Sequence, residues 1–260
     1  MSQALLRETI RQILCEEAGA GKITELVGKI SQINDEIAQV YNDVPPETVP
    51  RFGVRVESLG DGARISFAVS GMTYRGVLTP GRVTSSTTSV EAEQLGDMLG
   101  GIDVPWGVID VGDMGEENQA GLECSGAWVV KETHDTKRGW GPLLYDVAIE
   151  AATEDAGGLT PDRFRVTPAA QGVWSRYIDS RGADVTPAQL DLSDHDIEMW
   201  REEGLELVHL TPDDPTDDCY QSTAIGSAGA KWGDSPLSKA YRKPPTTTAT
   251  LEAAGALFRV

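Results

Sequence analysis

The sequence predicts a fold of the mixed α+β or α/β class, with a central sheet flanked by helices, an N-terminal helical arm and a loop-rich C-terminal tail. Three observations lead to this prediction. The first 40 residues carry an amphipathic helical pattern, residues 52–111 contain alternating apolar segments typical of strands, and residues 126–155 combine a strand, a glycine turn and a helix. We therefore expect three parts, at residues 1–45, 46–210 and 211–260.

The composition is that of an acidic globular protein. Of its 260 residues, 40% are hydrophobic and 24% are charged, the formal net charge is −19, and the isoelectric point is about 4.5. This hydrophobic content is enough for one good-sized core. A surface this acidic repels phosphate backbones, so we expect no direct binding of duplex nucleic acid.

Neither a membrane span nor a secretory signal is predicted. No apolar run approaches the ~20 residues that span a bilayer, and the segment 1–8 lacks a basic region followed by an apolar one. Cys15, Cys124 and Cys219 are widely spaced and odd in number, and the histidines are scattered. The pattern therefore indicates neither a disulfide framework nor a zinc site, and a reducing compartment fits it best.

The N-terminal arm is predicted as two helices. The first covers residues 3–17 and ends at the glycines of 19–21. In the second, apolar residues repeat every seven positions in two series three residues apart, the a/d pattern of a coiled-coil seam: Ile23, Ile30 and Ile37, and Leu26, Ile33 and Val40. Two interpretations stay open, a helical hairpin packed on its own domain or an arm that pairs with another subunit or partner.

The middle of the chain is predicted to be rich in strands. Consecutive prolines at 45–46 end the arm, because proline cannot continue a helix. The alternating segments predict strands at 52–57, 63–69 and 72–78, a polar loop at 84–89, a helix at 90–99 and a further strand at 106–111.

The most informative stretch combines a strand at 121–133 with a glycine turn and a helix at 142–155. The turn, Lys137–Gly141, has two cations at its front edge, and Pro142 suits the first turn of the helix. Free N–H groups and the positive end of the helix dipole make such a turn an anion site, for which a diphosphate-bearing cofactor is the natural occupant. The alternative is an ordinary strand-to-helix turn that uses glycine for its backbone conformation.

The segments that follow are shorter. We expect a short strand at 157–161, a helix at 168–178 with Thr167 as its N-cap, and a strand at 205–210. From residue 211 onward the sequence is loop-like, except for a small closing helix near 249–258.

Residues 121–180 resemble the central part of the GNAT acetyltransferase superfamily. That pattern is a long strand, a Gly-x-Gly loop that grips the cofactor pyrophosphate, a helix, a short strand and a second helix. Gly139-Trp140-Gly141 is similar to the loop, and the segment 170–177 looks like the second helix. The resemblance implies that the N–H groups of Arg138 to Gly141 hold the pyrophosphate of acetyl-CoA, with Lys137 and Arg138 adding charge. It also implies that Val129 and Val130 run beside the pantetheine.

Two positions depart from this family pattern. Thr136 stands where the family usually has Gln or Arg, and Trp174 stands where a Tyr often protonates the leaving thiolate. Indole is not a useful proton donor, so Tyr177 is a candidate replacement, with a core position as the alternative. Glu132 and His134, near the end of the long strand, are the candidates for a general base, with an exposed strand carboxylate and a loop histidine as the alternatives.

A second resemblance concerns the whole chain. Four segments look like those of proteins from marine tailed phages: 5–14, 141–146, 173–177 and 235–241. This implies a virion structural or accessory protein on a GNAT-like scaffold, located in the virion or the host cytoplasm, with other copies of itself or other virion proteins as partners. The alternative is an active acetyl-CoA-dependent N-acetyltransferase that acts on an amine.

Overall fold

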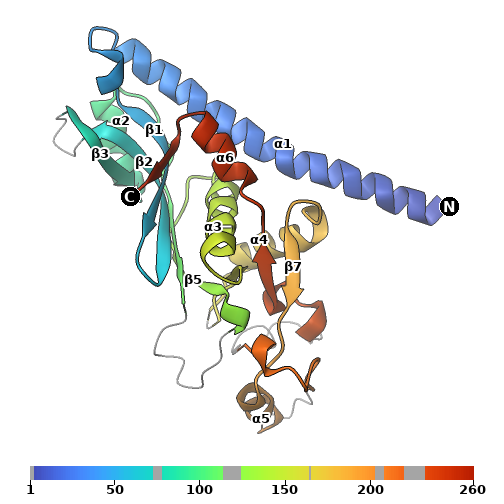
Figure 1. Ribbon diagram of the computed structural model, residues 1–260. Coiled ribbons are helices and arrows are strands. Elements are labelled where there is room, and N and C mark those ends of the chain that lie inside the picture. The colour runs from blue at the N-terminus through green and yellow to red at the C-terminus, as the bar shows by residue number, and fades with distance from the viewer. Residues whose placement is uncertain (1–2, 73–77, 114–123, 164, 203–207, 220–231) are drawn as a thin grey trace. The chain divides into compact units, whose positions relative to one another are not determined.

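The computed structural model describes residues 3–72, 78–113, 124–163, 165–202, 208–219 and 232–260 (Figure 1). The chain separates into two compact units, each made of segments that are distant in sequence. Unit 1 contains Met1–Gly19, Val111–Lys131 and Ile149–Pro244, and unit 2 contains Ala20–Asp110, Glu132–Ala148 and Pro245–Val260. Each unit combines helices with strands, so the general mixed α/β class is confirmed.

Unit 2 is built on four adjacent strands in the order β3-β2-β1-β9. β1 (Arg51–Ser58) pairs with β2 (Gly62–Met72) in antiparallel fashion, β2 pairs antiparallel with β3 (Leu78–Ser86), and β1 pairs in parallel with β9 (Leu257–Arg259). Within β2, the residues from Ile65 to Val69 are all fully buried. β2 is therefore covered on both faces, since successive side chains of a strand point to opposite faces.

Two further strands each begin in one unit and end in the other. β4 (Val108–Gly112) begins in unit 2, just after Gly107, whose carbonyl accepts a hydrogen bond from the Phe67 N–H of β2 at 3.3 Å. β5 (Trp128–Thr133) ends in unit 2 and leads to α3 (Gly141–Asp155). Unit 2 also contains the helices α2 (Ser89–Met98) and α6 (Thr246–Ala253).

A single glycine allows β9 to approach β1. A Cβ atom at Gly53 would lie 2.2 Å from the backbone oxygen of Ala256. That oxygen accepts the Val54 N–H at 2.8 Å. Any larger residue at position 53 would therefore push Ala256 and β9 away from β1.

Helix α1 (Gln3–Val40) runs without a break through Gly19–Gly21, so the prediction of two separate helices was wrong. A glycine inside a helix costs only about 1 kcal/mol relative to alanine, which a long helix tolerates. In the unit 2 part of α1, the Asn34 side chain accepts the Phe52 N–H at 2.7 Å and donates to the Phe52 carbonyl at 2.9 Å. This amide fixes α1 against β1.

The heptad seam of α1 is largely buried by the chain itself. Ile23, Leu26, Ile30 and Ile37 are buried, Ile33 is half-buried, and Val40 is exposed. This burial fits the interpretation in which the helix packs on its own domain. Pairing of the seam with another chain stays a prediction that only an assembled state can test.

We expect Ile30→Val to lower the free energy of unfolding by about 1 kcal/mol, because it removes one methylene group from a fully buried site. Chemical denaturation at two protein concentrations measures this. Ile33→Val, at a half-buried position of the same helix, is the matched control and should cost less. A loss that grows with dilution would mean that the seam is completed by a second chain.

In its described residues, unit 1 contains strands in the order β5-β6-β8-β7. β5 and β6 (Leu159–Thr160) are parallel, β6 and β8 (Lys239–Arg242) are antiparallel, and β8 and β7 (Thr186–Gln189) are antiparallel. Its described α-helical residues lie in α4 (Pro168–Ser180), α5 (Asp194–Glu202), the end of α3 and the start of α1. As predicted, Thr167 caps α4 by accepting the Ala170 N–H at 3.2 Å.

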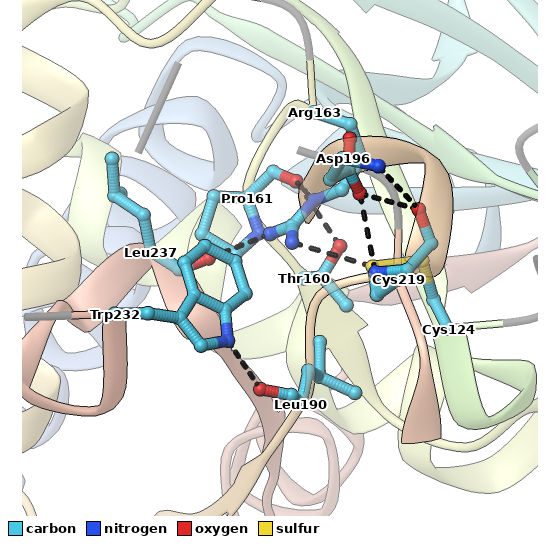
Figure 2. Close-up of a disulfide and its surroundings, with 10 residues drawn as sticks. Cys124, Thr160, Pro161, Arg163, Leu190, Asp196, Cys219, Trp232 and Leu237 are labelled. Atoms are coloured by element: carbon cyan, nitrogen blue, oxygen red, sulfur yellow. Dashed lines mark hydrogen bonds between the residues drawn. A yellow bond between two sulfur atoms is a disulfide. The ribbon is translucent and has the colours of Figure 1, made fainter. Parts of the chain in front are cut away.

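The expectation that no disulfide forms was wrong. Cys124 and Cys219 are bonded, with an S–S distance of 2.08 Å and a sequence separation of 95 (Figure 2). The bond lies in a buried cluster with Ala127, Leu190 and Ala240. Because structural disulfides persist in oxidising surroundings, this finding also removes the basis for expecting a reducing compartment. Spacing in sequence could not show that these two cysteines meet.

The charged side chain of Arg163 is fully buried beside this disulfide. Figure 2 shows its guanidinium aimed at the Leu237 carbonyl, to which it donates at 2.8 Å, and it also donates to the Pro161 carbonyl at 3.0 Å and to Cys219 Sγ at 3.4 Å. Burial lowers the pKa of Arg163 to about 9. The segments around residues 161, 219 and 237 are thus held together by one side chain.

The tail after residue 211 is more structured than predicted. Besides α6, which lies a few residues before the expected position, it supplies β8 and β9. Helix α5 was not foreseen. Of the predicted strand at 205–210, residues 208–210 form no strand, and residues 205–207 lie outside the described residues. Residues 73–77 and 121–123, which belong to two other predicted strands, also lie outside them.

Among the described residues, no helix is both long and apolar enough to cross a membrane.

Candidate functional site

The predicted succession of strand, glycine turn, helix, short strand and second helix is present in the order β5, turn, α3, β6, α4. The turn is closed by a hydrogen bond from the Trp140 N–H to the Lys137 carbonyl at 3.0 Å. Gly139 adopts φ +89° at its third position, the conformation of a type II turn that favours glycine. The predicted cofactor turn is therefore a compact β-turn that leads directly into α3.

The cations of the turn differ in their surroundings. Lys137 Nζ lies 2.5 Å from Asp103 Oδ2 and 5.7 Å from the ring centroid of Trp106. The Lys137 N–H donates to the Trp106 carbonyl at 3.1 Å. Arg138 is exposed. The lysine that was expected to attract a diphosphate thus already has a carboxylate and an indole beside it.

Thr136 also has a packing role. Its hydroxyl donates to the His134 carbonyl at 3.3 Å. A Cβ atom at Gly107 would lie 2.5 Å from Thr136 Oγ1. The Thr136 side chain therefore fits tightly over a glycine beside β4.

A hollow of about 330 Å³ lies beside the residues that contact Lys137. Three carboxylates and an indole are among the side chains that line it: Glu93, Asp97, Asp103 and Trp106. Such a lining favours a cationic group over an anionic one. The hollow is therefore unsuited to a diphosphate and suited to an amine.

The side chains of the two candidate bases, Glu132 and His134, lie against each other on the surface. Glu132 Oε1 lies 3.3 Å from His134 Nε2, and their side chains are 60% and 50% exposed. Val129 and Val130, which precede them on β5, are buried. The structure thus brings Glu132 and His134 together in the same unit as the turn, where both side chains are open to solvent.

Tyr177 lies in unit 1 and packs in an aromatic cluster. Its ring centroid is 6.0 Å from those of Trp174 and Tyr241, and Arg181 lies 5.5 Å from the same ring. Trp174 stacks on Tyr241 at 4.9 Å. All three aromatic side chains are buried. This environment matches the interpretation in which Tyr177 is part of the core.

The structure also brings together three residues that sequence reasoning did not select. Asp191 follows β7, His209 lies 18 positions later, and Asp218 precedes Cys219. Each offers one ligand atom, and these atoms lie within 4.8 Å of one another. We call this group the Asp–His–Asp cluster. No spacing motif in the sequence predicts this cluster, because the three segments come together only in the folded chain.

The fully buried carboxylate of Asp191 organises the cluster. Its Oδ2 accepts the N–H groups of Leu210 and Thr211, each at 2.8 Å, and its Oδ1 accepts the Leu192 N–H at 2.8 Å. Burial opposes ionisation of Asp191, but these N–H donors outweigh it and lower the pKa. Asp191 is therefore a carboxylate held in one orientation.

Around Asp191, carboxylates outnumber cationic groups. Burial raises the pKa of Asp218, and the carboxylates of Asp191 and Asp217 raise it further, against the opposing effect of His209. The pKa of Asp217 is raised by burial and also by Asp191 and Asp214. Carboxylates that raise each other's pKa create a negative potential, which a cation relieves.

The fold and these sites define a mixed α/β chain that carries a glycine turn before a helix and a separate carboxylate–histidine cluster. Comparison with protein-family models, with curated proteins and with solved structures finds no match. The functional conclusion therefore rests on the residues themselves.

Proposed function

We propose that the chain is a structural or accessory protein of a phage particle, built on a GNAT-like acetyltransferase scaffold. The observation that carries this proposal is that the chain itself engages two of the groups that a cofactor would need. Lys137 lies against Asp103 and Trp106, and the Trp140 N–H closes the turn. The order of elements from β5 to α4 and the resemblance of segments 5–14 and 235–241 to phage proteins support it further.

In this proposal the contacts with neighbouring copies or other virion proteins are made by α1 and by the tail. Because the seam is buried within unit 2, the exposed side of α1 is the surface available over this stretch. It carries polar and charged residues: Gln32, Asp35, Glu36 and Gln39. A molar mass above that of one chain, measured by light scattering, supports self-assembly through this surface. A monomer at all concentrations contradicts it.

A second function has one specific observation in its favour. The acidic hollow that contains Trp106 suits a cationic amine, the acceptor that an acetyl-CoA-dependent N-acetyltransferase requires. In that hypothesis the turn residues Arg138 to Gly141 bind acetyl-CoA, and Glu132 or His134 removes a proton from the amine. The two functions differ in whether the turn binds the cofactor.

Calorimetric titration with acetyl-CoA separates them. We expect no binding at millimolar ligand, because the Asp103 carboxylate competes with a diphosphate for Lys137 and repels it. Gly141→Glu and Gly141→Ala are matched variants, since a Cβ atom at this position meets nothing within 4 Å. Micromolar binding that Gly141→Glu abolishes and Gly141→Ala retains would overturn the structural proposal and establish the cofactor site.

A further inference from the structure

We propose that the Asp–His–Asp cluster of unit 1 binds a divalent transition metal ion of the Zn²⁺ type. The proposal is independent of the GNAT resemblance. It rests on the arrangement of Asp191, His209 and Asp218, whose ligand atoms lie within 4.8 Å of one another. Two carboxylates and one neutral imidazole balance the charge of a divalent ion. Three protein ligands leave a position for water, as in open zinc sites.

The orientation of His209 is the first independent support. Its Nε2 lies 3.0 Å from Asp194 Oδ1, and its Nδ1 faces Asp191 Oδ2 at 3.4 Å. When Nε2–H donates to Asp194, the lone pair of Nδ1 points toward the other two ligands. Histidines that bind metals typically donate their outer N–H to a carboxylate in this way. Asp194 is thus the positioning residue of the site.

The surroundings of Nδ1 are the second support. This atom is buried, and it has no hydrogen-bond partner in the part of the chain that the structure describes. A buried polar nitrogen that is left unpaired is costly. A metal ion between Nδ1 and the two carboxylates satisfies the nitrogen and relieves the repulsion between the carboxylates.

The frame around the cluster is rigid enough to preform it. Asp191 N–H donates to the Asp217 carbonyl at 2.9 Å, and Cys219 N–H donates to the Asp191 carbonyl at 3.0 Å. The Cys124–Cys219 disulfide then holds the residue next to Asp218. Asp191 Oδ1 accepts one N–H and keeps a second lone pair. The cluster is therefore set in place before any ion arrives.

The ligand types select the metal. Imidazole nitrogen suits zinc and other transition metals, whereas Mg²⁺ and Ca²⁺ prefer sites made of oxygen alone. We therefore expect Zn²⁺ to bind with one ion per chain. Mg²⁺ and Ca²⁺ should bind at least tenfold more weakly.

The experiment is a titration of the oxidised 260-residue chain with Zn²⁺ against a chromophoric chelator, without thiol reagents. The Cys15→Ser background removes the thiol that is not part of the disulfide. We expect Asp218→Asn, which keeps the shape of the side chain, and His209→Gln each to weaken binding at least tenfold. Asp194→Asn should weaken it about 10-fold or more through the orientation of the imidazole. Circular dichroism checks that each variant is folded.

His134→Gln is the matched control, because His134 also faces a carboxylate but lies on the surface of unit 2. Its Zn²⁺ affinity should equal that of the background. X-ray absorption of the loaded protein should show nitrogen and oxygen ligands near 2.0–2.1 Å and no sulfur. Absence of saturable binding at millimolar Zn²⁺ would overturn the proposal and leave His209 as an ion-pair partner of Asp194. An affinity unchanged in Asp218→Asn and His209→Gln would also overturn it.

Discussion

Replacing Cys124 and Cys219 by serine is expected to lower the free energy of unfolding of unit 1 by about 4 kcal/mol. The bond joins residues 95 positions apart. In the chain-entropy model, the stabilisation by a disulfide grows with the length of the loop it closes and reaches about 4–5 kcal/mol near 100 residues. The bond also packs against buried apolar residues, so replacing two sulfur atoms by smaller hydroxyl groups loses apolar contacts as well.

Guanidinium denaturation of the oxidised chain and of the double serine variant, followed by tryptophan fluorescence, measures this loss. Cys15→Ser is the control for a general effect of removing a cysteine. Mass spectrometry under non-reducing conditions first establishes that the two thiols are bonded. Equal midpoints for the oxidised chain and the double variant would show that the fold does not depend on the bond.

Most elements were predictable because their signals are local. The alternation of apolar residues placed β1 and β2 within a few residues of their observed bounds, and Thr167 marked the start of α4. The break predicted in α1 is absent for a physical reason, because burial of the apolar residues from Ile23 to Ile37 outweighs the low helix propensity of two glycines. Local propensity is a weak signal where tertiary burial is large.

The short strands β7, β8 and β9 could not be predicted from their own residues. Each has three or four residues and is stabilised by the strand beside it. Their pairing partners are far away in sequence; β9, for example, pairs with β1, which lies in the first quarter of the chain. Sequence patterns reveal amphipathic faces, but they do not reveal which distant segment completes a sheet.

The candidate sites show the same difference between local features, which were predictable, and contacts between distant segments, which were not. Strand, glycine turn and helix are consecutive in sequence, so the turn before α3 was predictable. The approach of Asp103 to Lys137 was not, because 34 positions separate them. The Asp–His–Asp cluster and the disulfide also depend on contacts between distant segments, and scattered histidines and cysteines gave no local signal for either.

The second large effect concerns a buried ion pair in unit 1. Glu150 of α3 and Lys243, which follows β8, form a salt bridge in which each side chain is only 1% exposed. We expect Lys243→Met to lower the free energy of unfolding by about 3–5 kcal/mol, because it leaves the Glu150 carboxylate buried without its cation. The change in size is small, so packing should contribute little to this loss. Urea denaturation at neutral pH measures it.

The double variant Lys243→Met/Glu150→Leu should recover most of the lost stability, since removing both charges also removes the cost of burying them. Lys29→Met, at the exposed pair with Glu25, is the matched control and should change stability little. A double variant as unstable as Lys243→Met alone would show that the cost is steric. In that case the backbone near Lys243, whose N–H donates to Thr153 Oγ1 at 3.0 Å, would be the element that anchors this segment to α3.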